Sequence, residues 1–224
     1  MDRRLFLVGA AGAAAAGGAF MYLRPDGAPQ SELTAFGSAN AQTNSDVDWS
    51  HISDMAIGSE DAPITVIEYA SMTCPHCAAF HNEVFPAIKE EYVETGKVRF
   101  IMREVYFDRF GLWGTMIARC GGGMRYWGLQ DVFFAQQSEW RQGETVQDVV
   151  NNMRAIGRQA GFNDAQLDEC LQDQEMAEAL VARFEHQMAE HDISGTPTFI
   201  INGQQYSNMR INEFRSVLNE KLAE

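Results

Sequence analysis

A strand, a helix and a second strand follow one another early in the chain, and this run constrains the fold more than any other segment. Residues 64–70 are β-branched and aromatic, which is typical of a strand. Residues 75–94 carry apolar side chains at helical spacing, and Gly96 ends the expected helix. Residues 98–102 form the second expected strand. Connections of this kind indicate a parallel β-α-β unit.

The later part of the chain predicts a helical block, a hairpin and a closing helix. Residues 111–190 show helical apolar spacing throughout, interrupted by glycines. Residues 198–201 and 204–206 are typical of strands, and the Asn202-Gly203 pair between them is a strong hairpin signal. An amphipathic helix follows at residues 211–222. We therefore expect an α/β fold whose two halves are separated by a long helical segment.

The tetrapeptide Cys74-Pro75-His76-Cys77 follows the first expected strand and begins the first helix. Pro75 suits the first helical position, because an N–H group there would have no partner. Free N–H groups and the helix dipole would stabilise a thiolate at Cys74, and a protonated His76 would add positive charge. Cys77 lies one turn further and deeper. The pattern predicts thiol–disulfide exchange, with Cys74 as the attacked sulfur and Cys77 as the resolving one.

Three other roles for the Cys74–Cys77 pair are less well supported by the sequence. A zinc site would need further Cys or His ligands at finger spacing, and none lies nearby. A structural disulfide within one helical turn would close a very short loop and so stabilise little. A permanently reduced pair does not suit an exported protein. We predict a redox-active pair that needs no metal and no cofactor.

The N-terminal residues contain the three parts of an export signal. Arg3-Arg4-Leu5-Phe6-Leu7 is similar to a twin-arginine motif and precedes an uncharged run ending at Leu23. Ala39-Asn40-Ala41 supplies a cleavage site, so we expect a signal peptide at 1–41 and a linker at 42–56. The alternative is an uncleaved membrane anchor, because the uncharged run is nearly long enough to span a bilayer. Both alternatives export the folded part, and we expect a periplasmic location.

Two segments resemble the DsbA family of bacterial disulfide oxidoreductases. The segment from Glu68 to Cys77 is similar to the active-site segment of that family, and Gly195-Thr196-Pro197-Thr198-Phe199 is similar to its cis-proline loop. The resemblance extends over residues 52–224. It implies a thioredoxin fold with an inserted α-helical domain, with the thioredoxin domain at 57–108 and 191–224 and the inserted domain at 109–190.

The same resemblance implies roles for residues outside the tetrapeptide. Glu68 matches a buried acid that assists proton movement at Cys77, whereas the sequence alone allows a strand glutamate that faces solvent equally well. Pro197 alone would be expected in the trans form. The resemblance implies a cis bond, which would turn the Thr196 backbone toward the sulfurs, where a substrate strand can pair. The other histidines are interpreted as surface or core residues: His51, His81, His186 and His191.

Cys120 and Cys170 lie on the apolar faces of two expected helices in the helical segment. Four cysteines allow three pairings, and the sequence alone does not choose among them. Two buried free thiols are the alternative to a disulfide. The oxidising compartment favours a structural disulfide, and several DsbA-family members carry such a pair. The bond would close a loop of about fifty residues, which the chain-entropy model values at roughly 4 kcal/mol.

These features predict an exported oxidoreductase that donates its Cys74–Cys77 disulfide to folding extracytoplasmic proteins. The expected partners are reduced or unfolded exported polypeptides and, from the resemblance, a DsbB-like membrane oxidase. The formal net charge of -14 argues against nucleic acid as a partner. A disulfide isomerase or reductase is one alternative, because Thr196 resembles the isomerase-type loop. A chaperone-like assembly factor with secondary redox activity is another.

Overall fold

The computed structural model describes residues 47–224, apart from the side chain of Met124, and builds them around one mixed sheet. The strand order is β1-β3-β2-β4-β5. Strands β2 and β3 are parallel, and the other neighbours are antiparallel. The expected β-α-β unit and hairpin are confirmed. The strands are β1 (Met55–Ile57), β2 (Ile64–Ala70), β3 (Val98–Glu104), β4 (Thr198–Ile201) and β5 (Gln204–Ser207).

Helices cover the sheet and fill the segment between β3 and β4. The helical block expected there and the closing helix are both present. The helices are α1 (Pro75–Glu83), α2 (Phe85–Ile88), a π-helical turn η1 (Lys89–Val93), α3 (Arg109–Cys120), α4 (Gly122–Ala135), α5 (Gln137–Trp140), α6 (Val146–Gln159), α7 (Asp164–Gln172), α8 (Gln174–Glu190) and α9 (Ile211–Ala223).

Two details differ from the expectation. The single helix expected over 75–94 is wrong, because the chain leaves regular helix at Val84, where φ is -112° and ψ is -50°. Pro86 follows immediately, and proline has no N–H group to donate to the preceding turn. Strand β1 was not expected, and it pairs antiparallel with β3 at the edge of the sheet. It is only 3 residues long, which is too short for an alternating pattern to be recognised.

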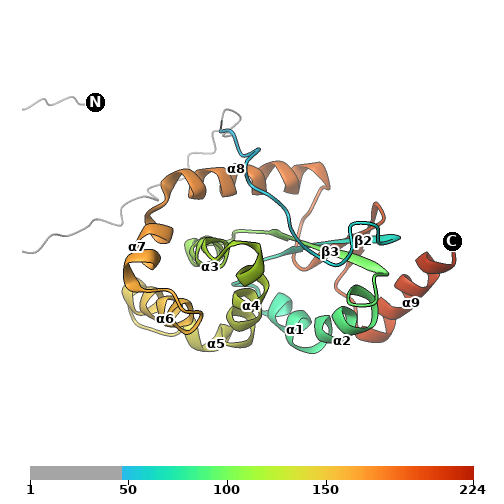
Figure 1. The fold of residues 1–224 in the computed structure, drawn as a ribbon, viewed down its shortest axis with the longest axis horizontal. Coiled ribbons are helices and arrows are strands. Elements are labelled where there is room, and N and C mark those ends of the chain that lie inside the picture. The colour runs from blue at the N-terminus through green and yellow to red at the C-terminus, as the bar shows by residue number, and fades with distance from the viewer. Residues whose placement is uncertain (1–46) are drawn as a thin grey trace, which may run out of the picture. The chain divides into compact units, whose positions relative to one another are not determined.

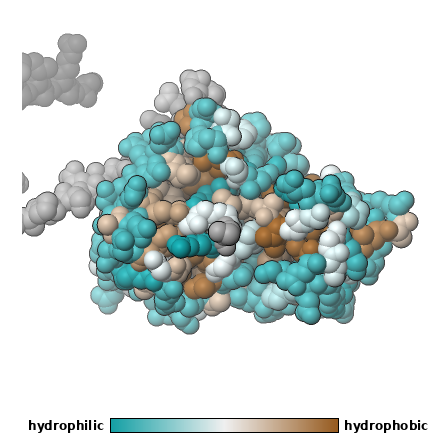
Figure 2. Space-filling view, in the orientation of Figure 1, coloured by the Kyte–Doolittle hydropathy of each residue, from teal (hydrophilic) through white to brown (hydrophobic). Residues whose placement is uncertain are grey.

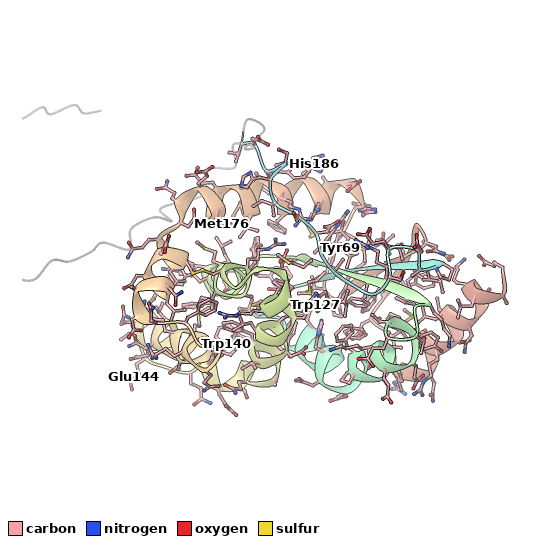
Figure 3. All side chains as sticks on the ribbon, in the orientation of Figure 1. Tyr69, Trp127, Trp140, Glu144, Met176 and His186 are labelled. Carbon is pink, nitrogen blue, oxygen red and sulfur yellow. A yellow bond between two sulfur atoms is a disulfide. The ribbon has the colours of Figure 1, made fainter. Side chains whose placement is uncertain are left out.

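Helices lie on both faces of the sheet (Figure 1), with α8 along one face and α1, α2 and α9 along the other. Successive side chains of a strand point to opposite faces. Tyr69 on β2 therefore points to α8, where its hydroxyl donates to the carbonyl oxygen of Gln187 at 3.1 Å. Figure 3 shows Tyr69 between the sheet and α8. Glu68, the preceding residue, points to the face covered by α1.

The helices between β3 and β4 are packed against the sheet and helix α2 by aromatic side chains and by a buried ion pair. Trp127 on α4 (Figure 3) contacts Phe85 and Phe100, with ring centroids 5.9 Å and 6.1 Å away. Near the end of α3, Arg119 donates to both carboxylate oxygens of Glu104 on β3 at 2.8 Å. Both of these charged side chains are buried. The helical block is thereby tied to the end of a central strand.

A disulfide joins Cys120, the last residue of α3, to Cys170 on α7. Cys170 is buried, as expected from its position on an apolar helix face. The expectation is wrong for Cys120, which is exposed. The reason is its place at the helix end, where the chain turns away from the core through Gly121 and Gly122. A purely structural role for the pair stays a prediction.

The expected signal peptide at 1–41, with its arginine pair and its cleavage site, lies outside the described residues. The first part of the expected linker at 42–56 also lies outside them. Within residues 47–224, no helix has the length and apolar character needed to cross a bilayer. On the face drawn in Figure 2, hydrophilic residues surround smaller hydrophobic areas. The large hydrophobic side chains exposed in this range are Phe107 and Val146.

Candidate active site at Cys74 and Cys77

Cys74 and Cys77 lie where strand β2 ends and helix α1 begins. Cys74 is the residue that caps the N-terminus of α1, with an extended backbone (φ -82°, ψ 119°), and Pro75 is the first helical residue. Both cysteines are free thiols in this structure. Cys74 is 7% exposed and Cys77 is fully buried. Only the sulfur at the helix start is therefore accessible to another molecule.

The loop before β4 lies beside these sulfurs because of the register of the sheet. Strand β4 is antiparallel to β2, and Thr198 pairs with Tyr69. The residues just before β4 thus come next to the residues just after β2. The Thr196–Pro197 bond is cis, as the family resemblance implies. The thiol of Cys74 donates to the carbonyl oxygen of Thr196 at 3.5 Å.

The two thiols have opposite tendencies to ionise. The pKa of Cys74 is lowered to about 5, first by a hydrogen bond with Cys77. Burial opposes this lowering, whereas hydrogen bonds with Thr196 and with the backbone N–H groups of Cys77 and His76 add to it. The pKa of Cys77 is raised, first by burial and then by its hydrogen bond with Cys74 and the charge of Glu68. At neutral pH the reduced pair therefore holds a thiolate at Cys74 and a thiol at Cys77.

His76 takes part through its backbone. Its side chain is exposed to solvent, and it is the backbone N–H group of this residue that lowers the pKa of Cys74. The N–H groups at a helix N-terminus are well placed for this, since they have no partner within the helix. The expected contribution of a protonated imidazole stays a prediction.

Glu68 is fully buried. The solvent-facing alternative for this glutamate is therefore wrong. One carboxylate oxygen, Oε2, lies 2.8 Å from Nε2 of His81 on α1, and both side chains are almost completely shielded from solvent. The His81 ring stacks on Phe134 with centroids 4.2 Å apart. His81 is therefore a core residue and not a surface residue.

Residues of the helical block hold the loop that carries Cys74. The buried amide of Gln137 on α5 donates to the carbonyl oxygens of Met72 at 2.7 Å and of Cys74 at 3.0 Å. Arg141 donates to the carbonyl oxygen of Thr73 at 2.9 Å. Neither residue was predicted from the sequence, because no local motif marks either of them. His81 was also missed, although its place four residues after Cys77 puts the two side chains on one helix face.

The geometry fits reversible exchange between a disulfide and two thiols. Within residues 47–224, no group of three or more His, Cys, Asp or Glu side chains is arranged to hold a metal ion. The reactive groups are the sulfurs themselves, with one accessible thiolate, one buried thiol and a buried carboxylate nearby. The backbone carbonyl oxygen of Thr196 lies 3.5 Å from the accessible sulfur.

Comparisons with known proteins point in the same direction. A family model described as Thioredoxin matches residues 50–220. A protein of Rickettsia bellii, provisionally named a protein-disulfide oxidoreductase, is 31% identical over 172 residues, which are 76% of this chain and 65% of the relative. A protein of the same name from Rickettsia typhi is 29% identical over 75% of this chain and 62% of the relative. The chain thus spans somewhat less than two thirds of the length of these curated relatives.

Two solved structures are similar to this one. The crystal structure of Wolbachia pipientis alpha-DsbA1 is 27% identical, with a TM-score of 0.71, and the match covers 76% of this chain and 91% of that chain. The crystal structure of oxidised BdbD from Bacillus subtilis is 19% identical, with a TM-score of 0.62, and the match covers 76% and 94%. The second likeness concerns the fold alone. Both agree with a thioredoxin fold that carries a helical insertion.

Proposed function

This chain belongs to the thioredoxin family as one of its DsbA-like members, and from that premise we propose that it is an exported thiol–disulfide oxidoreductase. It donates the disulfide of Cys74 and Cys77 to extracytoplasmic proteins that are still folding. The observation that carries the proposal is the contrast between the two thiols: the pKa of Cys74 is lowered to about 5, whereas that of Cys77 is raised. Stabilising one thiolate favours the reduced pair and so makes the disulfide an oxidant.

The reaction follows from this contrast in two steps. A substrate thiolate attacks the sulfur of Cys74, the Cys74–Cys77 bond breaks, and Cys77 leaves with the bonding electrons and takes up a proton. A second substrate thiolate then attacks the substrate sulfur of the mixed disulfide, and Cys74 leaves as a thiolate. The substrate loses two electrons and the cysteine pair gains two. The low pKa of Cys74 makes it a good leaving group in the second step.

The partners follow from the same chemistry. Reduced or unfolded exported polypeptides are the electron donors, and an extended segment of such a chain can pair with the backbone at Thr196 and Pro197. A DsbB-like membrane oxidase then restores the disulfide. The location is periplasmic, with residues 1–41 acting as the export signal. The domain organisation is a thioredoxin domain at 57–108 and 191–224, with a helical domain at 109–190.

One observation favours isomerisation or reduction as a second candidate. The hydroxyl of Thr196 is buried and, apart from its interaction with the two cysteine sulfurs, has no hydrogen-bond partner in the described part of the chain. This hydroxyl lies beside the accessible sulfur and could hold a mispaired substrate disulfide during rearrangement. The structural role of the Cys120–Cys170 disulfide is the same under either candidate.

Refolding of two forms of one substrate protein separates the candidates. The fully reduced form should gain its disulfides in the presence of oxidised protein and a glutathione buffer, and Cys74→Ser should abolish the effect. Rescue of the scrambled form without oxidation of the reduced form would reject the oxidase in favour of the isomerase. Suppression of substrate aggregation that Cys74→Ser leaves intact would instead support the chaperone-like alternative.

A further inference from the structure

Cys77 must exchange a proton with solvent each time the disulfide opens or closes, yet it is fully buried. The raised pKa of its thiol means that the leaving thiolate takes up a proton at neutral pH. Cys74 cannot supply that proton, because its sulfur is at that moment bonded to the substrate in the mixed disulfide. A route from solvent to Cys77 must therefore pass through other side chains.

Glu68 and His81 form a buried polar chain that leads away from Cys77. Glu68 and Cys77 are both fully buried, and the charge of Glu68 contributes to the raised pKa of Cys77. The next link is the 2.8 Å contact between Oε2 of Glu68 and Nε2 of His81. Gln130 on α4 brings its amide nitrogen within 3.4 Å of the same imidazole nitrogen.

The remaining polar atoms of this cluster have no partner within the described chain. Nδ1 of His81, Oε1 of Glu68 and Oε1 of Gln130 are all buried and unpaired there. Such atoms are rare in folded proteins, because each one loses its hydrogen bonds to water without gaining others. Three such atoms close together therefore destabilise the folded protein, and a site that served only to pack the core would not need them. An imidazole with Nε2 on a carboxylate and Nδ1 unpaired has the arrangement needed to pass a proton through its ring.

A surface pocket of about 300 Å³ is lined in part by His81. Its walls come from α1, α2, η1 and α4, and the lining residues are His81, Asn82, Phe85, Pro86, Lys89, Asp131 and Ala135. Asn82, Pro86, Asp131 and Ala135 are exposed, so the pocket is open to solvent. The rings of Phe85 and Phe134 pack against the ring of His81 and supply no proton donor or acceptor.

The titratable groups around His81 come from each element that surrounds it. Cys77 lies on the same face of α1, Glu68 on β2, Lys89 on η1 and Asp131 on α4. Partial burial raises the pKa of Asp131, while the charges of His81 and Lys89 oppose this rise. Asp131 therefore interacts electrostatically with His81, and both residues line the pocket.

We propose that His81 is a positioning residue that carries protons between this pocket and Glu68, and so to and from Cys77. The proposal rests on the disulfide-exchange function proposed above and deepens it. When Cys77 leaves the disulfide, Nε2 of His81 gives its proton to the Glu68 carboxylate, Glu68 passes that proton to the Cys77 thiolate, and Nδ1 of His81 takes up a proton from the pocket. Only bonds to hydrogen change in this relay, and no electron pair leaves the protein.

Chemical rescue tests the relay directly. His81→Ala joins the vacated space to the pocket, so added imidazole can occupy the place of the ring. We expect single-turnover oxidation of a dithiol peptide by oxidised His81→Ala to be slower by about tenfold or more, as for loss of a proton-transfer group. Imidazole should restore the rate, and its effect should be larger at about pH 6 than at about pH 8, because the protonated form is the donor. Pyrrole, which matches the shape and has no basic nitrogen, should restore nothing.

Two further variants complete the experiment. His81→Phe keeps a ring stacked on Phe134 and fills the space, so it should be equally slow and insensitive to imidazole. His186→Ala removes an exposed histidine of α8 and should leave the rate unchanged. A wild-type rate in His81→Phe, or equal rescue of His81→Ala by pyrrole, would overturn the relay. If His81→Ala fails to fold, the oxidation rate of His81→Phe alone tests the relay. Failure of the wild-type protein to oxidise the peptide would instead refute the proposed function.

Discussion

At the scale of single residues, the site depends on the different environments of two cysteines that are three positions apart. Cys74 caps a helix and is in contact with Thr196, whereas Cys77 is enclosed by the core above Glu68. The hydrogen bond between the two sulfurs acts in opposite senses, since it lowers the pKa of one and raises that of the other. The chemistry of the pair thus follows from position in the fold and not from residue type.

Titration of the reduced protein should reveal the Cys74 thiolate directly. Absorbance at 240 nm should rise with a midpoint near pH 5, the pKa of Cys74, and this step should be absent from Cys74→Ser. Cys77→Ala should move the midpoint to higher pH, because the hydrogen bond from Cys77 is the largest cause of the lowering. A midpoint above pH 8 in the wild-type protein would show that the thiolate is not stabilised.

The same shift should make the stability of the reduced protein depend on pH. The folded pKa of about 5 lies below the reference value of 9.0, so the unfolded chain binds the extra proton between these two values. The contribution of Cys74 is therefore complete above about pH 9, declines as the pH falls, and is absent below about pH 5. Denaturant unfolding of reduced wild type and reduced Cys74→Ser across this range gives the difference. A difference that does not vary with pH would count against the account.

The sequence predicts this site only where the determinants are local. Cys74 and Cys77 stand out by their spacing, and the likeness of their segments to a known family draws attention to Glu68 and Pro197. Gln137 cannot be found in this way, because it contacts Met72 across 65 positions. His81 could have been noticed from its spacing to Cys77. Its contact with Glu68 nevertheless depends on how α1 packs against β2, which spacing alone does not define.

At the scale of secondary-structure elements, short helix α5 holds the active-site loop in place. Gln137 supplies both amide hydrogens to carbonyl oxygens of this loop, and Arg141 binds a third. The conformation of Cys74 is thus set partly from within the helical block. The main elements were predictable from period and turn chemistry, as the β4–β5 hairpin illustrates. The break at Val84 and the short strand β1 were not, because they depend on one proline and on pairing with a distant strand.

Replacing Gln137 by Leu should weaken this connection. The change leaves the carbonyl oxygens of Met72 and Cys74 buried without their donor, and each such loss costs roughly 1–3 kcal/mol. For the two carbonyl groups together, we expect denaturant unfolding to show a loss of roughly 2–6 kcal/mol, and peptide oxidation to slow as the loop loosens. Gln159→Leu, at an exposed position near the end of α6, is the matched control. Equal stability of the two variants would mean that α5 does not hold the loop.

At the scale of the whole folded unit, the inserted helices are joined to the sheet by buried charge and closed by a covalent bond. Glu104 is held by Arg119, and Tyr126 on α4 donates to the same carboxylate at 2.8 Å. Burial opposes ionisation of this carboxyl, yet the arginines and the tyrosine keep its pKa below the usual value. The Cys120–Cys170 disulfide joins α3 to α7 across 50 positions.

Removing that disulfide should lower stability without removing the redox pair. The chain-entropy model gives roughly 4 kcal/mol for a loop of this length. We therefore expect the double variant Cys120→Ala, Cys170→Ala to unfold at lower denaturant concentration by about that free energy. The oxidised protein should still exchange its Cys74–Cys77 disulfide with glutathione. An unchanged unfolding midpoint would show that the bond does not constrain the helical block.

The reduction potential of the Cys74–Cys77 pair tests the central claim most directly. A pKa lowered from 9.0 to about 5 stabilises the reduced form at pH 7 by roughly 3 kcal/mol, which corresponds to about 60 mV. Equilibration with glutathione at pH 7 should therefore give a potential near about -210 mV, which is about 60 mV on the oxidising side of thioredoxin at about -270 mV. A value at or below about -270 mV would contradict the account, because such a pair would reduce its partners instead of oxidising them.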